Sequence, residues 1–182
     1  MLDLFLKGGP LMWPILICSV VALGVALQKW LMLRRALQQL SVRIDDVVEQ
    51  RPPLLSPIMY AIDTGCSDEE ITLIGSGQLR SLQRGLGMLS LISLISPLLG
   101  LTGTVTGMIE AFQTIALQQG RVEVSMLAGG IWQALLTTAA GLLVAIPSHV
   151  AFHVLDGQMD DIAASMKEVA IVLKKKKEKH EF

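Results

Sequence analysis

The chain is poor in the residues that carry most catalytic and metal chemistry. Its 182 residues include two cysteines, three histidines and one tyrosine. The cysteines and histidines show no metal-ligand spacing. Cys18 falls in an apolar segment and Cys66 in a polar one, so we expect no disulfide between them. Because no nucleophile–base pair or phosphate-binding loop is recognisable either, we predict neither an enzyme nor a cofactor or metal site.

Charged residues are missing from three long intervals: residues 8–28, 85–109 and 124–155. Each interval reaches the roughly 20 residues that a helix needs to cross the hydrocarbon of a bilayer. The core of a soluble protein could contain one such run, but hardly three. Together with 52% apolar residues, this pattern predicts an all-α membrane protein with three transmembrane helices, two of them extended into a cytoplasmic helical bundle.

Basic residues are distributed unevenly around these intervals, and cytoplasmic flanks are enriched in Lys and Arg. We therefore predict an external N-terminus, a cytoplasmic middle segment and a cytoplasmic C-terminus. The C-terminal lysines are interpreted as a solvated, topogenic tail, with no sign of nucleic-acid binding. Between the first two spans lie Lys29, Arg34, Arg35, Arg43, Arg51, Arg80 and Arg84, after the third lie Lys167, Lys174–Lys177 and Lys179, and only Lys7 and Arg121 remain for the other side.

Local signals divide the chain further. Ser56-Pro57 and Thr64-Gly65 bracket a short helix, and Ser67 with Glu70 forms a capping box. From that box we expect one helix through Arg84 into the second span. The predicted segments are residues 1–33 (external N-terminus and span one), 34–84 (cytoplasmic helices), 85–117 (span two), 118–125 (external turn), 126–155 (span three) and 156–182 (cytoplasmic helix and basic tail).

Apolar residues outside the spans recur at helical spacing. After span one, the repeat from Leu33 to Val47 predicts that the helix continues into the cytoplasm. After span three, Met159, Ile162, Met166, Val169 and Leu173 predict a narrow helix–helix seam.

Small and hydroxylated residues form a stripe along each of the second and third predicted spans. Such stripes suit either close helix packing or a narrow polar path, and the residues alone leave both readings open. Thr102 and Thr106 lie on the opposite face of span two. The stripe of span two includes Ser93, Ser96, Gly100, Gly103, Thr104 and Gly107, and that of span three includes Gln133, Thr137 and Gly141 and is flanked by Thr138.

No carboxylate occurs between Arg84 and Glu110 or between Glu123 and Asp156, so the second and third predicted spans have none at mid-depth. A proton path through hydrocarbon normally contains an ionisable residue, because burying one is costly and is kept only for a function. The chain therefore either conducts nothing or supplies a polar wall for an acid held by another chain. Glu110 is a candidate for an outer mouth or an ordinary interfacial acid. His149 and His153 are candidates for a relay at the inner end of span three or ordinary interfacial histidines.

Two long segments resemble a known family. S-P-L-L-G-L-T-G-T-V-T-G-M-I-E-A-F (residues 96–112) and G-G-I-W-Q-A-L-L-T-T-A-A-G-L-L-V-A-I-P (residues 129–147) look like the signature segments of the ExbB/TolQ/MotA proton-channel family, most closely its ExbB and TolQ branch. G-G-P-L-M-W-P-I-L near the N-terminus also resembles that branch. The resemblance implies a multi-pass protein of the bacterial inner membrane that turns proton motive force into work.

The resemblance also implies partners and site residues. It implies a homopentamer around an ExbD/TolR-like single-span protein with a membrane Asp, and a TonB/TolA-like protein that spans the periplasm. Thr104 and Thr138 match the family's pore-lining threonines, whereas Gln133 stands where many members have Glu. The competing hypothesis is a non-conducting scaffold that holds partner helices by small-residue packing.

Overall fold

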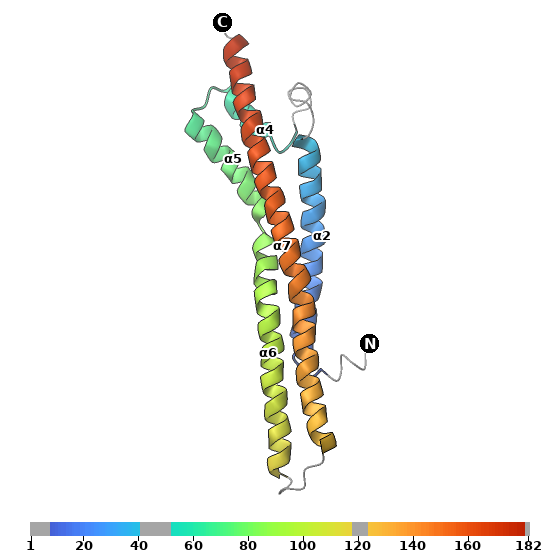
Figure 1. The fold of residues 1–182 in the computed structure, drawn as a ribbon. Coiled ribbons are helices and arrows are strands. Elements are labelled where there is room, and N and C mark those ends of the chain that lie inside the picture. Colours follow the sequence, from blue (N-terminus) through green and yellow to red (C-terminus); the bar gives the residue numbers. More distant parts are fainter. Residues whose placement is uncertain (1–7, 41–51, 118–123, 181–182) are drawn as a thin grey trace. The chain divides into compact units, whose positions relative to one another are not determined.

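The computed structural model describes residues 8–40, 52–117 and 124–180, and within these ranges every regular element is a helix (Figure 1). The helices are α2 (Met12–Leu40), α4 (Ser56–Asp63), α5 (Asp68–Gln83), α6 (Leu86–Leu117) and α7 (Val124–His180). Three stretches are long and apolar enough to cross a bilayer: Met12–Gln38, Leu86–Leu117 and Ala128–Lys177. The predicted all-α membrane protein with three transmembrane helices is confirmed.

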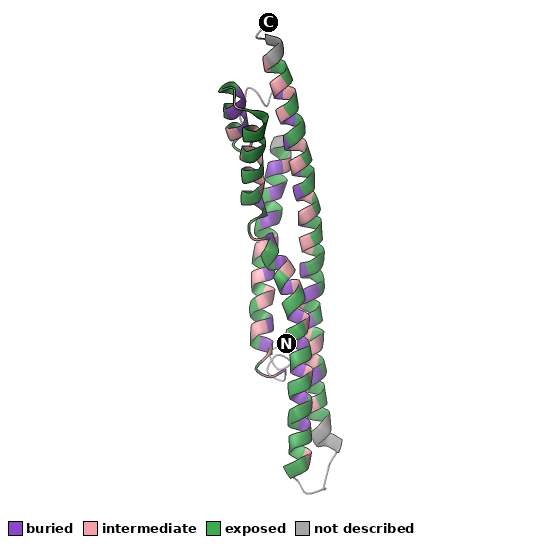
Figure 2. Ribbon diagram, turned by 90° about the vertical axis from the view of Figure 1, so that its left-hand side faces the viewer, coloured by how far each residue is buried: buried purple, intermediate pink, exposed green. Residues whose placement is uncertain are grey.

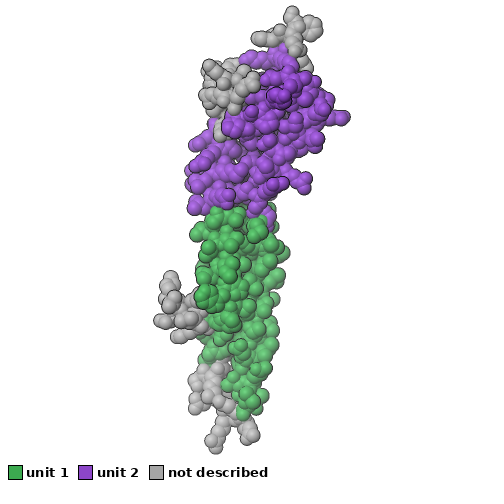
Figure 3. All heavy atoms as spheres, turned by 180° about the vertical axis from the view of Figure 1, so that it is seen from behind, with its two compact units in different colours: residues 1–26, 88–152 green, residues 27–87, 153–182 purple. Residues whose placement is uncertain are grey.

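The chain forms two compact units (Figure 3). Unit 1 comprises Met1–Ala26 and Met88–Phe152, and unit 2 comprises Leu27–Gly87 and His153–Phe182. Two predicted features lie outside the described residues: the helical repeat at Ile44 and Val47, and most of the turn at 118–125.

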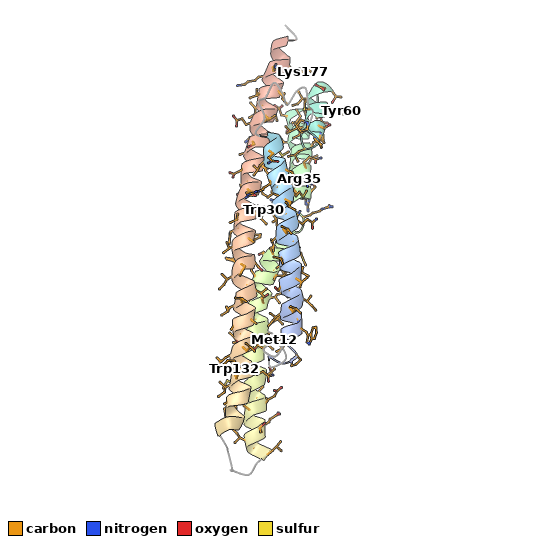
Figure 4. All side chains as sticks on the ribbon, turned by 90° about the vertical axis from the view of Figure 1, so that its right-hand side faces the viewer. Met12, Trp30, Arg35, Tyr60, Trp132 and Lys177 are labelled. Atoms are coloured by element: carbon orange, nitrogen blue, oxygen red, sulfur yellow. The ribbon has the colours of Figure 1, made fainter. Side chains whose placement is uncertain are left out.

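Unit 1 consists mainly of α6, the first part of α7 and the first part of α2. Its buried positions form narrow stripes along each helix, while the remaining faces are exposed (Figure 2). The exposed side chains are large and apolar: Leu94 and Leu98 on α6 and Trp132 and Leu143 on α7 are all at least 54% exposed, and Trp132 is labelled in Figure 4. Such surfaces are expected of helices that face lipid or other apolar helices.

Unit 2 is held together by the seam predicted for the second half of α7. Met159, Ile162, Met166, Val169 and Leu173 are all buried, and Ile162 is completely enclosed. The short helix α4 spans the residues between its two predicted bracketing signals, and Gly65 follows it with φ +76°.

Two lysines of the C-terminal run bind specific groups of unit 2, so interpreting the whole run as a solvated tail was wrong. The Nζ of Lys177 donates to the carbonyls of Ile62 (2.9 Å) and Asp63 (3.1 Å) at the end of α4 (Figure 4). The Nζ of Lys174 donates to the carboxylate of Asp68 at the start of α5, 2.5 Å away. Cations near a helix C-terminus satisfy its last carbonyls and interact favourably with the helix dipole.

The expected continuous helix from Asp68 into the second span is not present. α5 ends at Gln83 and α6 begins at Leu86, with Gly85 between them at φ +96°. A positive φ is incompatible with a right-handed helix and is readily adopted only by glycine. Beside this break, the buried Lys29 donates from Nζ to the carbonyl of Leu82, 2.8 Å away, and so satisfies one of the terminal carbonyls of α5.

The capping box at the start of α5 is confirmed. The backbone N–H of Glu70 donates to Ser67 Oγ (3.3 Å), and the N–H of Ser67 donates to the Glu70 carboxylate (2.9 Å). We expect Ser67→Ala to cost about 1 kcal/mol of local stability, because such a cap satisfies an otherwise unpaired amide. Amide hydrogen exchange in the first turn of α5 should then accelerate about fivefold. Ser76→Ala, later in the same exposed helix, serves as the control, and equal protection in both variants would contradict the cap's importance.

Candidate functional site

The second and third spans meet through small residues on both helices. A methyl group at Gly100 of α6 would lie 2.9 Å from Cα of Thr138 of α7, and one at Gly107 would lie 3.0 Å from the carbonyl oxygen of Gly130. A methyl group at Gly141 would lie closer still, 2.5 Å from the carbonyl oxygen of Ser96. Higher numbers on one helix meet lower numbers on the other, so the helices are antiparallel. Their backbones approach closely because these positions lack side chains.

Three hydroxyls lie within or beside this contact. Thr137 is 1% exposed and donates to the carbonyl of Ala134 on its own helix (2.8 Å). Thr138 donates from Oγ1 across the interface to the carbonyl of Gly100 (2.9 Å). Ser96 is fully buried, and its Oγ has no hydrogen-bond partner among the described residues. Gly100, Gly103, Gly107, Gly141, Ser96 and Thr137 are therefore packing positions within a single chain.

Thr104 lies at the edge of the contact. Successive helical residues rotate by about 100°, so Thr104 is turned by roughly 60° from the centre of the stripe on α6 that faces α7. It is partly exposed, and its Oγ1 donates to the carbonyl of Leu101 (2.6 Å). On α7, Thr138 is turned by about the same angle from the centre of the stripe that faces α6. Both rotations run in the same direction when each helix is followed from its N-terminus to its C-terminus. Because the helices are antiparallel, equal rotations bring both threonines to the same side of the pair.

A second polar pair lies on that same side. Ser93 of α6 and His149 of α7 lie within about 80° of the contact stripes of their helices, turned in the same direction as Thr104 and Thr138. Ser93 Oγ is 3.5 Å from Nδ1 of His149. We call the side defined by Ser93, Thr104, Thr138 and His149 the hydroxyl face. Apolar side chains flank it, including Leu101 and Leu142.

The first span lies on the opposite side of α7. Ser19, Ala22 and Ala26 of α2 line a shallow groove together with Val144, Pro147 and Ser148 of α7. On α7, these three residues lie on one side of the contact stripe and Thr138 lies on the other. The hydroxyl face is therefore left uncovered by α2 within unit 1.

The structure separates Gln133 and Glu110 from the hydroxyl face. A methyl group at Gly9 would collide with the side-chain amide of Gln133, which shows that Gln133 extends toward the segment preceding α2. Glu110 is exposed and rotated from the contact stripe toward the same side as Gln133. Among the described residues of unit 1, Glu110 is the only carboxylate and His149 the only histidine. The hydroxyl face therefore combines donors and acceptors with no acid of its own.

Two functional contacts were missed by sequence reasoning. Ser93 was recognised as part of the small-residue stripe but not as the partner of His149, because the two residues are far apart in the sequence. Lys29 was interpreted only as a topogenic charge. The spacing of the residues could have indicated that Lys29 is buried. Ile15, Ala22, Lys29 and Ala36 follow one another at intervals of seven residues, and all four are buried.

Comparisons with known proteins agree with these features. A profile of the MotA/TolQ/ExbB proton channel family matches residues 59–168. A biopolymer transport protein ExbB-like 1 from Synechocystis sp. is 33% identical over 201 residues, covering 94% of this chain and 78% of that protein. The biopolymer transport protein exbB1 of Vibrio cholerae is 32% identical, covering 77% of this chain and 72% of that protein.

A third relative matches a shorter part of the chain. The biopolymer transport protein ExbB of Salmonella typhimurium is 41% identical over 91 residues, which is 50% of this chain and 37% of that protein. The family profile includes all of α6 and the part of α7 that packs against it. With three membrane-spanning helices and a close α6–α7 contact, the chain is a multi-pass membrane protein that belongs to the MotA/TolQ/ExbB proton channel family.

Proposed function

We propose that this chain is a subunit of a bacterial inner-membrane complex that couples proton motive force to work in the cell envelope, as energiser of outer-membrane transport or of envelope maintenance. The observation that carries the proposal is the hydroxyl face, which is polar, uncovered by α2 and without a carboxylate. Hydroxyls can donate to a carboxylate, accept from its protonated form and hold water. Such a wall suits an acid that is supplied by another chain.

The assembly that we propose follows from this geometry and from family membership. Copies of the chain form a ring, a pentamer by resemblance, with the hydroxyl faces of α6 and α7 turned inward and α2 outward. An ExbD/TolR-like single-span partner places its membrane Asp against Thr104 and Thr138, and a TonB/TolA-like protein transmits the work across the periplasm. Ser96, Thr137 and the interface glycines then support the wall by holding α6 against α7, while Gln133 and Glu110 lie away from the path.

The orientation in the membrane is also part of the proposal. Positive flanking charges place the N-terminus and the α6–α7 connection outside, and residues 34–84 and 156–182 in the cytoplasm. His149, near the end of the charge-free interval, then lies toward the cytoplasmic side of α7.

Proton flux with and without the partner tests whether the proton-binding acid belongs to the partner chain. We expect vesicles that contain this chain alone to show no more potential-driven proton uptake than empty vesicles, because its hydroxyl face has no titrating carboxylate. Co-reconstitution with the Asp-bearing partner should produce uptake, measured with an enclosed pH-sensitive dye. The matched control replaces the partner's membrane Asp by Asn. Equal uptake by the chain alone, or by the Asn variant, would contradict the proposal.

The second candidate function is a non-conducting scaffold that holds partner helices. The close α6–α7 packing supports a packing role for the small residues, because they contact the neighbouring helix of the same chain and do not line an open path. Partner helices would then bind other surfaces of the chain. The two functions differ in what they require of Thr104 and Thr138: a conducting wall needs their hydroxyl groups, whereas a scaffold needs only their shape.

A further inference from the structure

We infer that His149, oriented by Ser93, is the residue that exchanges protons between the hydroxyl face and the cytoplasm. The inference rests on the proposed function and extends it by naming a proton-transfer residue on this chain and a positioning residue for it. Its structural basis is the contact between Ser93 Oγ and His149 Nδ1, which joins α6 to α7 on the side that also carries Thr104 and Thr138.

The hydrogen bonds of Ser93 indicate how the imidazole is oriented. Ser93 Oγ has a single hydrogen, which it donates to the carbonyl of Ser90 (2.8 Å). Toward His149 the same oxygen therefore acts as acceptor, so Nδ1 of His149 carries a hydrogen and donates it. With Nδ1–H directed to Ser93, proton exchange takes place at Nε2. This is the usual way in which a hydrogen bond to one ring nitrogen sets the role of the other.

The transfer step is balanced without any further reactant. His149 lies 11 residues and thus roughly 16 Å along α7 from Thr138, so water on the hydroxyl face carries the proton from the partner's carboxylic acid. Nε2 accepts that proton from water, and the ring becomes an imidazolium. The imidazolium then releases a proton to water on the cytoplasmic side, and the neutral tautomer is restored. His149 is exposed, so water can reach it.

Few other titratable groups are present near this site. On α6 the described residues of unit 1 include one charged group, Glu110, which is 17 positions and thus roughly 25 Å along the helix from Ser93. The described part of α2 in unit 1 has only Cys18 as a titratable side chain. Along α7 itself, His153 follows one turn and Asp156 two turns after His149. Imidazole is the side chain that ordinarily changes its charge between about pH 5 and 8.

The test is proton flux through the reconstituted complex at a series of cytoplasmic-side pH values. In His149→Asn the side-chain amide keeps a donor for Ser93 but cannot be protonated, so we expect flux to fall about tenfold and its dependence on cytoplasmic-side pH to weaken. Ser93→Ala removes the positioning contact and the bond to Ser90 within α6 but leaves the imidazole in place, so it should lower flux by a few-fold while the pH dependence remains.

His153→Gln is the matched control, an exposed histidine on the same helix, and it should keep both the rate and the pH profile. Size-exclusion chromatography with the partner confirms assembly of each variant. Wild-type flux and pH profile in His149→Asn would overturn the inference, as would loss of the pH dependence in His153→Gln instead. Either result leaves the proposed function standing if the complex still conducts through its partner's Asp, so the two failures are distinguishable.

Discussion

Replacing Thr104 and Thr138 together by valine is expected to abolish proton flux through the assembled complex and leave its assembly intact. Valine has almost the same shape as threonine but offers no hydrogen bond to an acid or to water. The structural cost is small: Thr104 loses a bond within its own helix, and Thr138 loses its donation to Gly100. Each lost bond is worth about 1 kcal/mol. In contrast, an unpartnered carboxyl group on an apolar wall is strongly disfavoured.

A matched control is available on the same helix. Thr102 and Thr106 donate to the carbonyls of Leu98 (2.8 Å) and Thr102 (3.1 Å), much as Thr104 donates to Leu101, but they are rotated away from the hydroxyl face. We expect Thr102→Val with Thr106→Val to retain flux. The measurement is dye-reported uptake normalised to assembled complex. Full flux in the Thr104 and Thr138 double variant would favour the scaffold and refute the proposed wall.

Gly141→Ala is expected to destabilise the helix pair by about 2 kcal/mol. Its new methyl group would lie 2.5 Å from the carbonyl oxygen of Ser96 and 3.3 Å from Cα of Gly100. Both are backbone atoms of α6, so no side chain can rotate out of the way, and the helices must separate. Overpacking of this kind costs about 1–3 kcal/mol or more, against a gain of about 0.5–1 kcal/mol from replacing a helical glycine by alanine.

Gly129→Ala on the same helix isolates the second effect. Gly129 has no atom within 4 Å of the position that a methyl group would occupy. We therefore expect it to keep or slightly raise the stability. Thermal unfolding of the purified protein in detergent, followed by circular dichroism, gives the comparison. If both variants melt at the same temperature, the α6–α7 contact is less close than the structure indicates.

Several elements could be predicted from the sequence because their causes are local. The capping box at Ser67 and Glu70 depends on residues three positions apart, and the seam from Met159 to Leu173 depends on helical spacing. The absence of charge in three intervals predicted the spans, because a bilayer imposes length and polarity on each helix separately. The break at Gly85 was missed because a glycine near the end of a helical pattern is compatible with both a continuing helix and a turn at positive φ.

The candidate site could not be predicted from the spacing of residues along single helices alone. Helical periodicity assigned Ser96, Gly100, Gly103, Thr104 and Gly107 to one stripe, but it could not say which of them a neighbouring helix would cover. The contact with α7 covers Ser96 and the three glycines and leaves Thr104 at its edge. Likewise, Gln133 belongs to a stripe of α7 that Thr138 flanks, yet Gln133 extends toward Gly9 while Thr138 bonds to Gly100.

By itself the sequence determined the class of protein, the helices and the stripes, because hydropathy, capping and helical periodicity act over a few turns of one helix. The tertiary structure alone decided that α6 and α7 meet glycine to backbone, that Lys29 caps α5, and that Ser93 and His149 join Thr104 and Thr138 on the side opposite α2. These arrangements depend on the relative rotation of antiparallel helices far apart in the chain. That rotation is set by how the small residues pack against each other, which no single helix specifies.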